Sequence, residues 1–126
     1  MNKQVSTKNA PDAIGPYSQA VIVGDTVYCS GQIPIVPQTG NVIDGDITVQ
    51  TEQVFKNISA VLQQAGTSLQ NVCKTTVFLQ NMADFSAMNA VYAKAFGECV
   101  YPARSAVEVA ALPKGALVEI EVIAKL

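Results

Sequence analysis

Arg104 is the only arginine in the chain, and its neighbours suit it to holding a small anion. Pro102 stiffens the backbone just before it, and a predicted strand from 105 to 112 begins just after it. A rigidly held guanidinium presents paired N–H donors that match the two oxygens of a carboxylate. Most isolated arginines are surface residues that contribute little, so the residue type alone does not make a site. The setting of Arg104 favours a clamp for a small carboxylate.

Glu119 is the candidate acid or base, in a predicted strand from 117 to 124. Burial raises the pKa of a carboxyl group and a nearby guanidinium lowers it, so a partly buried carboxylate can be tuned to hold and activate a water molecule. Glu121 lies two residues further along, on the same face of the strand. The pattern alone leaves the choice between these two glutamates open.

Two further candidates lie beside predicted elements in the first third of the chain. Tyr17 follows Gly15-Pro16, and Ser30-Gly31 closes a predicted hairpin. The phenol and the hydroxyl can donate hydrogen bonds, and a glycine lets backbone N–H groups approach a ligand closely. The more common role of these residue types is in turns and at strand ends, so that interpretation stands beside the functional one.

The composition excludes several classes of chemistry. The chain has no histidine, which removes the commonest metal ligand and the usual proton shuttle at neutral pH. The carboxylates show no ligand-like spacing, so neither a metal centre nor a Ser-His-Asp triad is expected. The net charge of −2 and the pI of about 4.9 provide no basic stripe for phosphates, so nucleic acid is not an expected partner.

Cysteine usage and the absence of long apolar runs bear on location. The cysteines at 29, 73 and 99 form no C-x-x-C pair and leave an odd thiol, which is typical of reduced core residues in a reducing compartment. No stretch approaches the ~20 apolar residues that span a bilayer, and the first residues lack the apolar segment of a signal peptide. We therefore expect a cytoplasmic protein with no membrane partner.

The elements that must position these side chains follow from hydrophobic spacing and turn residues. With 126 residues, 49% of them hydrophobic, the chain is expected to form a single domain over 1–126. An irregular N-terminal segment ends at Gly15-Pro16, and a long loop spans 31 to 46. Between and after them the order is ββ-α-β-α-ββ. The predicted strands are 20–23, 26–30, 73–80, 105–112 and 117–124; the helices run from a cap at Asp46 or Thr48 to Gly66, and from a cap at Asp84 to Gly97.

This order predicts an α+β fold with one sheet and both helices on the same face, because right-handed crossovers place them together. Alternation along the last two strands places Val107, Val118, Ile120 and Val122 on the helix-covered face. On the opposite face it places Arg104, Ala106, Glu108, Glu119, Glu121 and Ile123. That mixture is too apolar for open solvent and suits packing against further copies of the chain, with charged positions around cavities. A homo-oligomer is expected.

The spacing of the two main candidates adds a constraint. If the last two strands paired as a tight hairpin, Arg104 would lie about 20 Å from Glu119, too far for one small substrate. Either those strands are not neighbours, or Arg104 of one chain works with groups of another.

Ordered motifs across nearly the whole chain resemble the Rid family, also called YjgF, and most closely its RidA branch. They are GPYSQ at 15–19, SGQIP at 30–34, KTTVFL at 74–79, and PARS at 102–105 followed by LPK at 112–114 and VEIE at 118–121. The resemblance implies a chorismate-mutase-like fold and a homotrimer whose sheets form a central barrel, with clefts between subunits. It also implies hydrolysis of 2-imino acids, such as 2-iminobutanoate and 2-iminopropanoate, to 2-oxo acids and ammonia without a cofactor.

The family motifs also imply roles for individual residues. Arg104 is expected to clamp the substrate carboxylate and Glu119 to orient the attacking water. The cleft is expected to be lined by Tyr17, Ser30, Gly31 and Asn89. Ala106 stands where the family often has cysteine, so only a backbone contact with the substrate is expected there. Ala111 stands where an arginine is frequent, which alters the expected rim.

Two other functions stay open beside imine hydrolysis. One is a non-enzymatic sensor of 2-oxo acids, or a chaperone-like module, that uses the same clefts. The other is the endoribonuclease and translation-inhibitor activity linked to the family. The acidic pI and the missing histidine disfavour this last alternative.

Overall fold

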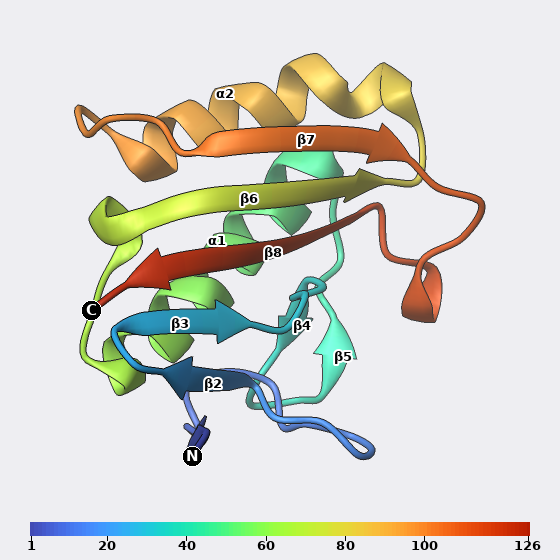
Figure 1. Ribbon diagram of the computed structural model, residues 1–126. Helices are drawn as coiled ribbons and strands as arrows, with labels where there is room; N and C mark the ends of the chain where they lie inside the picture. The colour runs from blue at the N-terminus through green and yellow to red at the C-terminus, as the bar shows by residue number, and fades with distance from the viewer.

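One mixed sheet forms the front of the molecule, and both long helices pack behind it (Figure 1). The computed structural model describes residues 1–126. The sheet has the strand order β1-β2-β3-β8-β6-β7, with β1 (Lys3–Val5), β2 (Ala20–Val23), β3 (Thr26–Cys29), β8 (Val118–Lys125), β6 (Val72–Leu79) and β7 (Ala103–Glu108). The helices are α1 (Ile47–Ala65) and α2 (Phe85–Phe96). The expected α+β fold with both helices on one side is confirmed.

The N-terminal third contains the predicted hairpin and more strand than the sequence indicates. β2 and β3 pair across a two-residue loop in which Gly24 has φ +62°, as a turn that begins on glycine requires. The segment before Gly15 is not wholly irregular, because β1 adds to the outer edge of this hairpin. The long loop from 31 to 46 likewise contains a small hairpin of β4 (Ile35–Val36) and β5 (Asn41–Val42). Strands this short leave no period in a sequence.

The helices begin and end close to the predicted residues. The side chain of Asp46 accepts a hydrogen bond from a first-turn amide of α1, and Gly66 ends that helix in the left-handed conformation. Asp84 precedes α2 but makes no side-chain cap. Asn81 instead caps the short 3-10 turn Met82–Asp84, which leads directly into α2.

The last two strands are not neighbours, because β6 lies between them (Figure 1). β7 runs parallel to β6 and reaches it through the crossover helix α2, whereas β8 runs antiparallel to β6. The hairpin distance calculated for Arg104 and Glu119 therefore does not apply.

The register of β7 overturns the predicted face of its side chains. Arg104 pairs with Thr75 of β6, and Ala106 pairs with Val77; both of these β6 residues are fully buried. Paired residues point to the same side of a sheet, so Arg104 and Ala106 lie on the helix-covered side. The prediction failed because β7 is an edge strand with its apolar residues on the open side, where Val107 is 43% exposed. Its alternation therefore has the opposite phase to that of a core strand.

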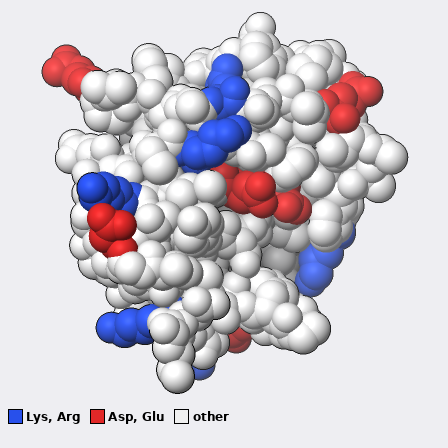
Figure 2. Space-filling model, in the orientation of Figure 1, with Lys and Arg blue, Asp and Glu red and all other residues white.

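The face of the sheet away from the helices, called the open face here, carries Glu119 and Glu121 of β8 as predicted. The cross-strand neighbour of Glu119 is Phe78, which in turn pairs with Val107. Figure 2 views this side of the molecule and shows that most of it is uncharged, with small groups of opposite charge. Glu108, expected on the open face, lies on the helix side, where its carboxylate accepts a hydrogen bond of 2.8 Å from the amide that begins the 3-10 turn before α2.

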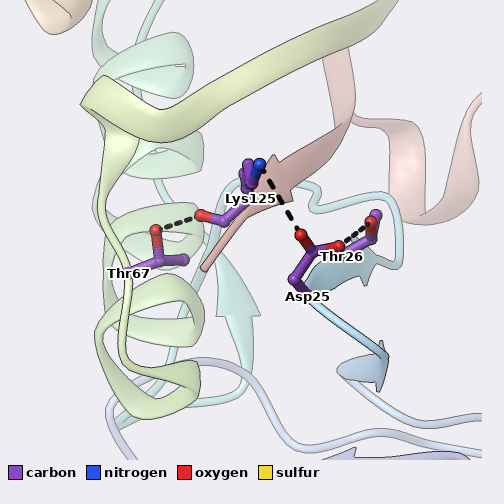
Figure 3. A network of polar contacts seen from close by, with 4 residues as sticks. All are labelled: Asp25, Thr26, Thr67 and Lys125. Carbon is purple, nitrogen blue, oxygen red and sulfur yellow. Dashed lines mark hydrogen bonds and ion pairs between the residues drawn. The ribbon is translucent and has the colours of Figure 1, made fainter.

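The core lies between the sheet and the helices, and polar contacts hold the end of β8 beyond it (Figure 3). The Thr67 hydroxyl donates to the backbone oxygen of Lys125 at 2.6 Å, which ties the connection after α1 to β8. The Lys125 ammonium lies 3.6 Å from the Asp25 carboxylate, but both side chains are largely exposed and the pair contributes little. No helix has the length and apolar character needed to cross a bilayer.

Candidate functional site

Three side chains of α2 contact Arg104, and they are spaced at i, i+4 and i+7: Phe85, Asn89 and Tyr92. Nη1 of Arg104 donates to Oδ1 of Asn89 at 2.7 Å. The guanidinium carbon lies 5.4 Å from the ring centroid of Phe85 and 4.7 Å from that of Tyr92. This spacing brings the three side chains to one side of the helix. The guanidinium is therefore held by a charge-assisted hydrogen bond and by aromatic rings.

A cavity of about 480 Å³ opens beside this guanidinium. Its lining is Asn89, Tyr92, Ala93, Tyr101, Pro102 and Arg104. The volume suits a small molecule. An arginine has five N–H donors, and Asn89 occupies only one nitrogen, so donors remain for a ligand in the cavity. Arg104 therefore lines a cavity with N–H donors to spare, although on the side of the sheet opposite to the one predicted.

Glu119 lines a second cavity, of about 430 Å³, together with Tyr17 and Gly31. Burial raises the pKa of Glu119, and the negative charge of Glu121 raises it further; no hydrogen bond lowers it. Glu121 itself is exposed and lies outside this cavity. The structure therefore separates the two glutamates that the sequence left equivalent, because only Glu119 lines this cavity and has a raised pKa.

Gly31 lies directly against the Glu119 carboxylate. The chain beyond β3 continues alongside β8, because the backbones of Gln32 and Ile120 bond each other at 2.9 and 3.1 Å. A Cβ added to Gly31 would overlap Oε2 of Glu119 and lie 2.9 Å from its Cδ. The backbone at Gly31 is not in the left-handed region, so glycine here permits the close approach of the Glu119 carboxylate and does not serve a turn.

The hydroxyl groups of Tyr17 and Ser30 differ in whether they are available to bind a ligand. Tyr17 is 51% exposed, and its phenol oxygen has only a long contact of 3.4 Å with the amide of Ile14. The Ser30 hydroxyl donates to the backbone oxygen of Ser18 at 2.6 Å and lines a separate pocket of about 260 Å³. Tyr17 can therefore meet a ligand beside Glu119, whereas the Ser30 proton already holds two segments together.

Ala106 is half-buried against the core and lines neither cavity. Phe85 and Tyr92 also contact Arg104, and neither is among the residues predicted for the site. The i, i+7 spacing of Phe85 and Tyr92 around Asn89 places all three on one side of the helix, but the same spacing is typical of aromatic residues that only face the core. Tyr92 serves both roles, since it is buried and also faces the guanidinium.

Within one chain five of the predicted site residues thus form two groups, and Ser30 and Ala106 belong to neither. Arg104 and Asn89 share the first cavity, and Tyr17, Gly31 and Glu119 share the second. Arg104 is on the helix-covered side of the sheet, while Glu119 is on the open face. No cavity contains both groups, and no three His, Cys, Asp or Glu side chains gather as a metal site would need.

Comparisons with known proteins match the whole fold. The family model described as endoribonuclease L-PSP matches residues 7–126. The crystal structure of YyfA from Yersinia pestis, a protein of unknown function in the conserved Rid family, has a TM-score of 0.98 and 56% identity over 100% of both chains. The fold also matches the structure of the Escherichia coli YjgF product, as the chorismate-mutase-like resemblance implied.

Two further relatives have names that describe a ligand or an activity. The human 2-iminobutanoate/2-iminopropanoate deaminase is 45% identical over 98% of this chain and 90% of its own. Escherichia coli TdcF, solved with bound serine, has a TM-score of 0.94 and 44% identity over 98% of each chain. On this evidence the chain belongs to the Rid (YjgF) family.

Proposed function

We propose that this protein hydrolyses reactive 2-imino acids to 2-oxo acids and ammonia, in clefts that a second copy of the chain completes. The observation that carries the proposal is the setting of Glu119. Its carboxylate has a raised pKa, lines a cavity of about 430 Å³ with Tyr17, and has space beside it only because residue 31 is glycine. A carboxylate in such a setting can hold a water molecule and accept its proton.

The chemistry needs few groups, because a protonated imine is already electrophilic. Glu119 accepts a proton as the water oxygen bonds to the imine carbon. The resulting tetrahedral intermediate carries an amino and a hydroxyl group on that carbon. Glu119 then returns the proton to the nitrogen, and the C–N bond breaks as the hydroxyl oxygen forms the carbonyl. The hydroxyl proton passes to the Glu119 carboxylate or to water, and ammonia leaves with the 2-oxo acid formed. Positioning and proton transfer supply the catalysis without a covalent intermediate.

Arg104 supplies the anchor for the substrate carboxylate in this proposal. Because one chain holds Arg104 and Glu119 in different cavities, Arg104 would come from a neighbouring copy. The largely uncharged open face supports such packing (Figure 2), as do the exposed side chains of Tyr28 and Val107, which are 46% and 43% accessible. A closed homotrimer, as the family resemblance implies, would repeat the composite cleft at each interface.

The named relatives support the same substrate class. The human relative is named for deamination of 2-iminobutanoate and 2-iminopropanoate. The serine bound to TdcF is a small α-amino acid, which has a carboxylate and an α-nitrogen as a 2-imino acid has. RNA cleavage, which the family description names, is less suited to a chain of net charge −2 with no histidine.

A coupled assay tests the activity. A pyridoxal-phosphate dehydratase generates 2-iminobutanoate, and the release of ammonia is followed with and without the purified protein. Acceleration over the uncatalysed rate supports the proposal. Binding of 2-oxobutanoate without acceleration would instead indicate a ligand sensor. Strongly salt-dependent RNA binding by the pure protein would favour the nucleic-acid alternative.

Mixed oligomers test the composite cleft. Arg104→Ala and Glu119→Gln subunits are each expected to be inactive or nearly so as pure oligomers. After unfolding and refolding together in equal amounts, about one cleft in four would combine an intact Arg104 with an intact Glu119. Recovery of activity in the mixture supports a shared cleft, and its absence in verified mixed oligomers contradicts it.

A further inference from the structure

The aromatic ring under Arg104 is itself held by a buried hydrogen bond. Oγ1 of Thr75 and the hydroxyl oxygen of Tyr92 lie 2.7 Å apart. Thr75 is 0% exposed and Tyr92 is 5% exposed. Thr75 is also the β6 residue that pairs with Arg104 across the sheet. The hydrogen bond therefore joins the strand beside Arg104 to the ring against which Arg104 lies.

The remaining surroundings of Tyr92 restrict its ring. Phe55 of α1 meets it edge-on, with centroids 5.7 Å apart and an interplanar angle of 80°. Phe96 meets it at 4.7 Å and 46°. Burial raises the pKa of the phenol, so Tyr92 is neutral at ordinary pH and meets the guanidinium through its π-face and not as an anion.

The buried positions of β6 show why the Thr75 hydroxyl requires an explanation. The fully or nearly fully buried residues of this strand are Val72, Thr75, Val77 and Leu79. Thr75 is the polar member of that set. Valine has the same shape and would avoid the burial of a hydroxyl. The only side chain that bonds this hydroxyl is Tyr92, so the threonine serves the orientation of that ring.

We propose that Thr75 and Tyr92 are positioning residues that hold the Arg104 guanidinium ready for the substrate carboxylate. The inference rests on the proposed imine hydrolysis and adds a specific support to it. The Tyr92 ring fixes where the guanidinium lies, the Thr75 hydroxyl fixes the ring, and Asn89 takes one N–H donor. The other donors are left to bind a carboxylate in the cavity at a low cost in side-chain ordering.

The test compares variants that remove a buried hydroxyl with one that keeps it. Thr75→Val and Tyr92→Phe each remove one partner of the hydrogen bond and keep the shape of the side chain. Thr75→Ser keeps the hydroxyl and is the rescue control. Each variant is assayed for kcat and KM with enzymatically generated 2-iminobutanoate. Its oligomeric state is checked by gel filtration.

A spectroscopic measurement makes the test independent of activity. Because the chain has a single arginine, a 15N-labelled sample gives one Nε–H signal, whose chemical shift reports ring currents from Phe85 and Tyr92. We expect Thr75→Val and Tyr92→Phe to move this signal and to raise KM about five- to tenfold with kcat changed less. Thr75→Ser is expected to stay close to wild type in both measurements.

The outcomes separate this inference from the proposed function. An unchanged arginine signal and KM in Thr75→Val would overturn the positioning role, even in an active enzyme. If the wild-type protein hydrolyses no imine but Thr75→Val still moves the arginine signal, the arrangement of Arg104 is supported and the proposed function is overturned. Equal losses in Thr75→Val and Thr75→Ser, with the arginine signal unmoved, would mark Thr75 as merely structural and contradict the proposal.

Discussion

The two halves of the candidate site are built in contrasting ways. Arg104 is held from several sides by regular elements, with Asn89, Phe85 and Tyr92 on one helix around it. The Glu119 carboxylate accepts no hydrogen bond within the chain, and its pKa is raised by burial and by a like charge. The first arrangement fixes the position of the Arg104 guanidinium. The second raises the free energy of the ionised Glu119 carboxylate. An anchor benefits from restraint, whereas a proton acceptor benefits from a pKa closer to neutrality.

Removal of the anchor should have the largest effect. We expect Arg104→Ala to abolish measurable imine hydrolysis, because the substrate carboxylate loses its charged partner. The coupled ammonia assay measures the loss, and gel filtration shows whether the oligomer is kept. Arg104→Lys is the matched control, since it retains the charge without the planar fork. Near-normal turnover by Arg104→Ala would show that Arg104 does not anchor the substrate carboxylate.

Removal of the negative charge of Glu119 should lower activity by less than removal of Arg104 does. Glu119→Gln is expected to lower kcat on the order of 10²-fold, the low end of what general acid–base catalysis contributes. Glu121→Gln, which changes an exposed residue outside the Glu119 cavity, is the comparison variant. If Glu121→Gln were the more damaging of the two, the roles assigned to the glutamates would be reversed.

The space beside Glu119 can be filled without a change in charge. Gly31→Ala places a methyl group where the Glu119 carboxylate lies. Because that carboxylate ends a flexible side chain, it should swing away, so activity falls about tenfold while the melting temperature changes little. In a Glu119→Gln background the same substitution should cost much less activity, since the displaced group no longer acts as a base. Additive losses would show that Gly31 acts independently of Glu119.

The smallest effect is on stability, and its sign follows from the raised pKa of Glu119. The folded state binds the Glu119 proton more tightly than the unfolded state does, so ionisation of this carboxylate destabilises the fold. That cost is absent below the unfolded pKa of about 4.3 and grows as pH rises through the higher folded value. Glu119→Gln should therefore melt above wild type at pH 8 but not at pH 4, by calorimetry. The exposed Glu98→Gln should show no such difference.

Most local structure was predictable from the sequence because its causes are local. The glycine in the first hairpin turn and the caps of α1 act within a few residues of chain. The structure has Gly24 and Gly66 as predicted, and the N-cap is Asp46 and not the alternative Thr48. The placement of β6 between β7 and β8 arises from pairings distant in sequence. No periodicity along a single strand contains that information.

The site was predictable by residue type and less so by arrangement. Glu119 lies on the predicted face with Gly31 and Tyr17 near it. Arg104 lies on the side opposite to the predicted one. The prediction was wrong because it assigned the apolar residues of an edge strand to the core-facing side. Local spacing does not tell a core aromatic from one that also supports a charge, which is why the role of Tyr92 emerged only from its contacts.

Tyr92 belongs to the buried aromatic group with Phe55 and Phe96 and also touches Arg104. Amides around it are consequently expected to exchange with deuterium only when the entire domain opens. The wall formed by residues 11–17 lies in a segment with no helix or strand, and its amides should exchange through small local fluctuations. A ligand could thus enter and leave through local fluctuations of residues 11–17, while the surroundings of Arg104 keep their shape until the protein unfolds.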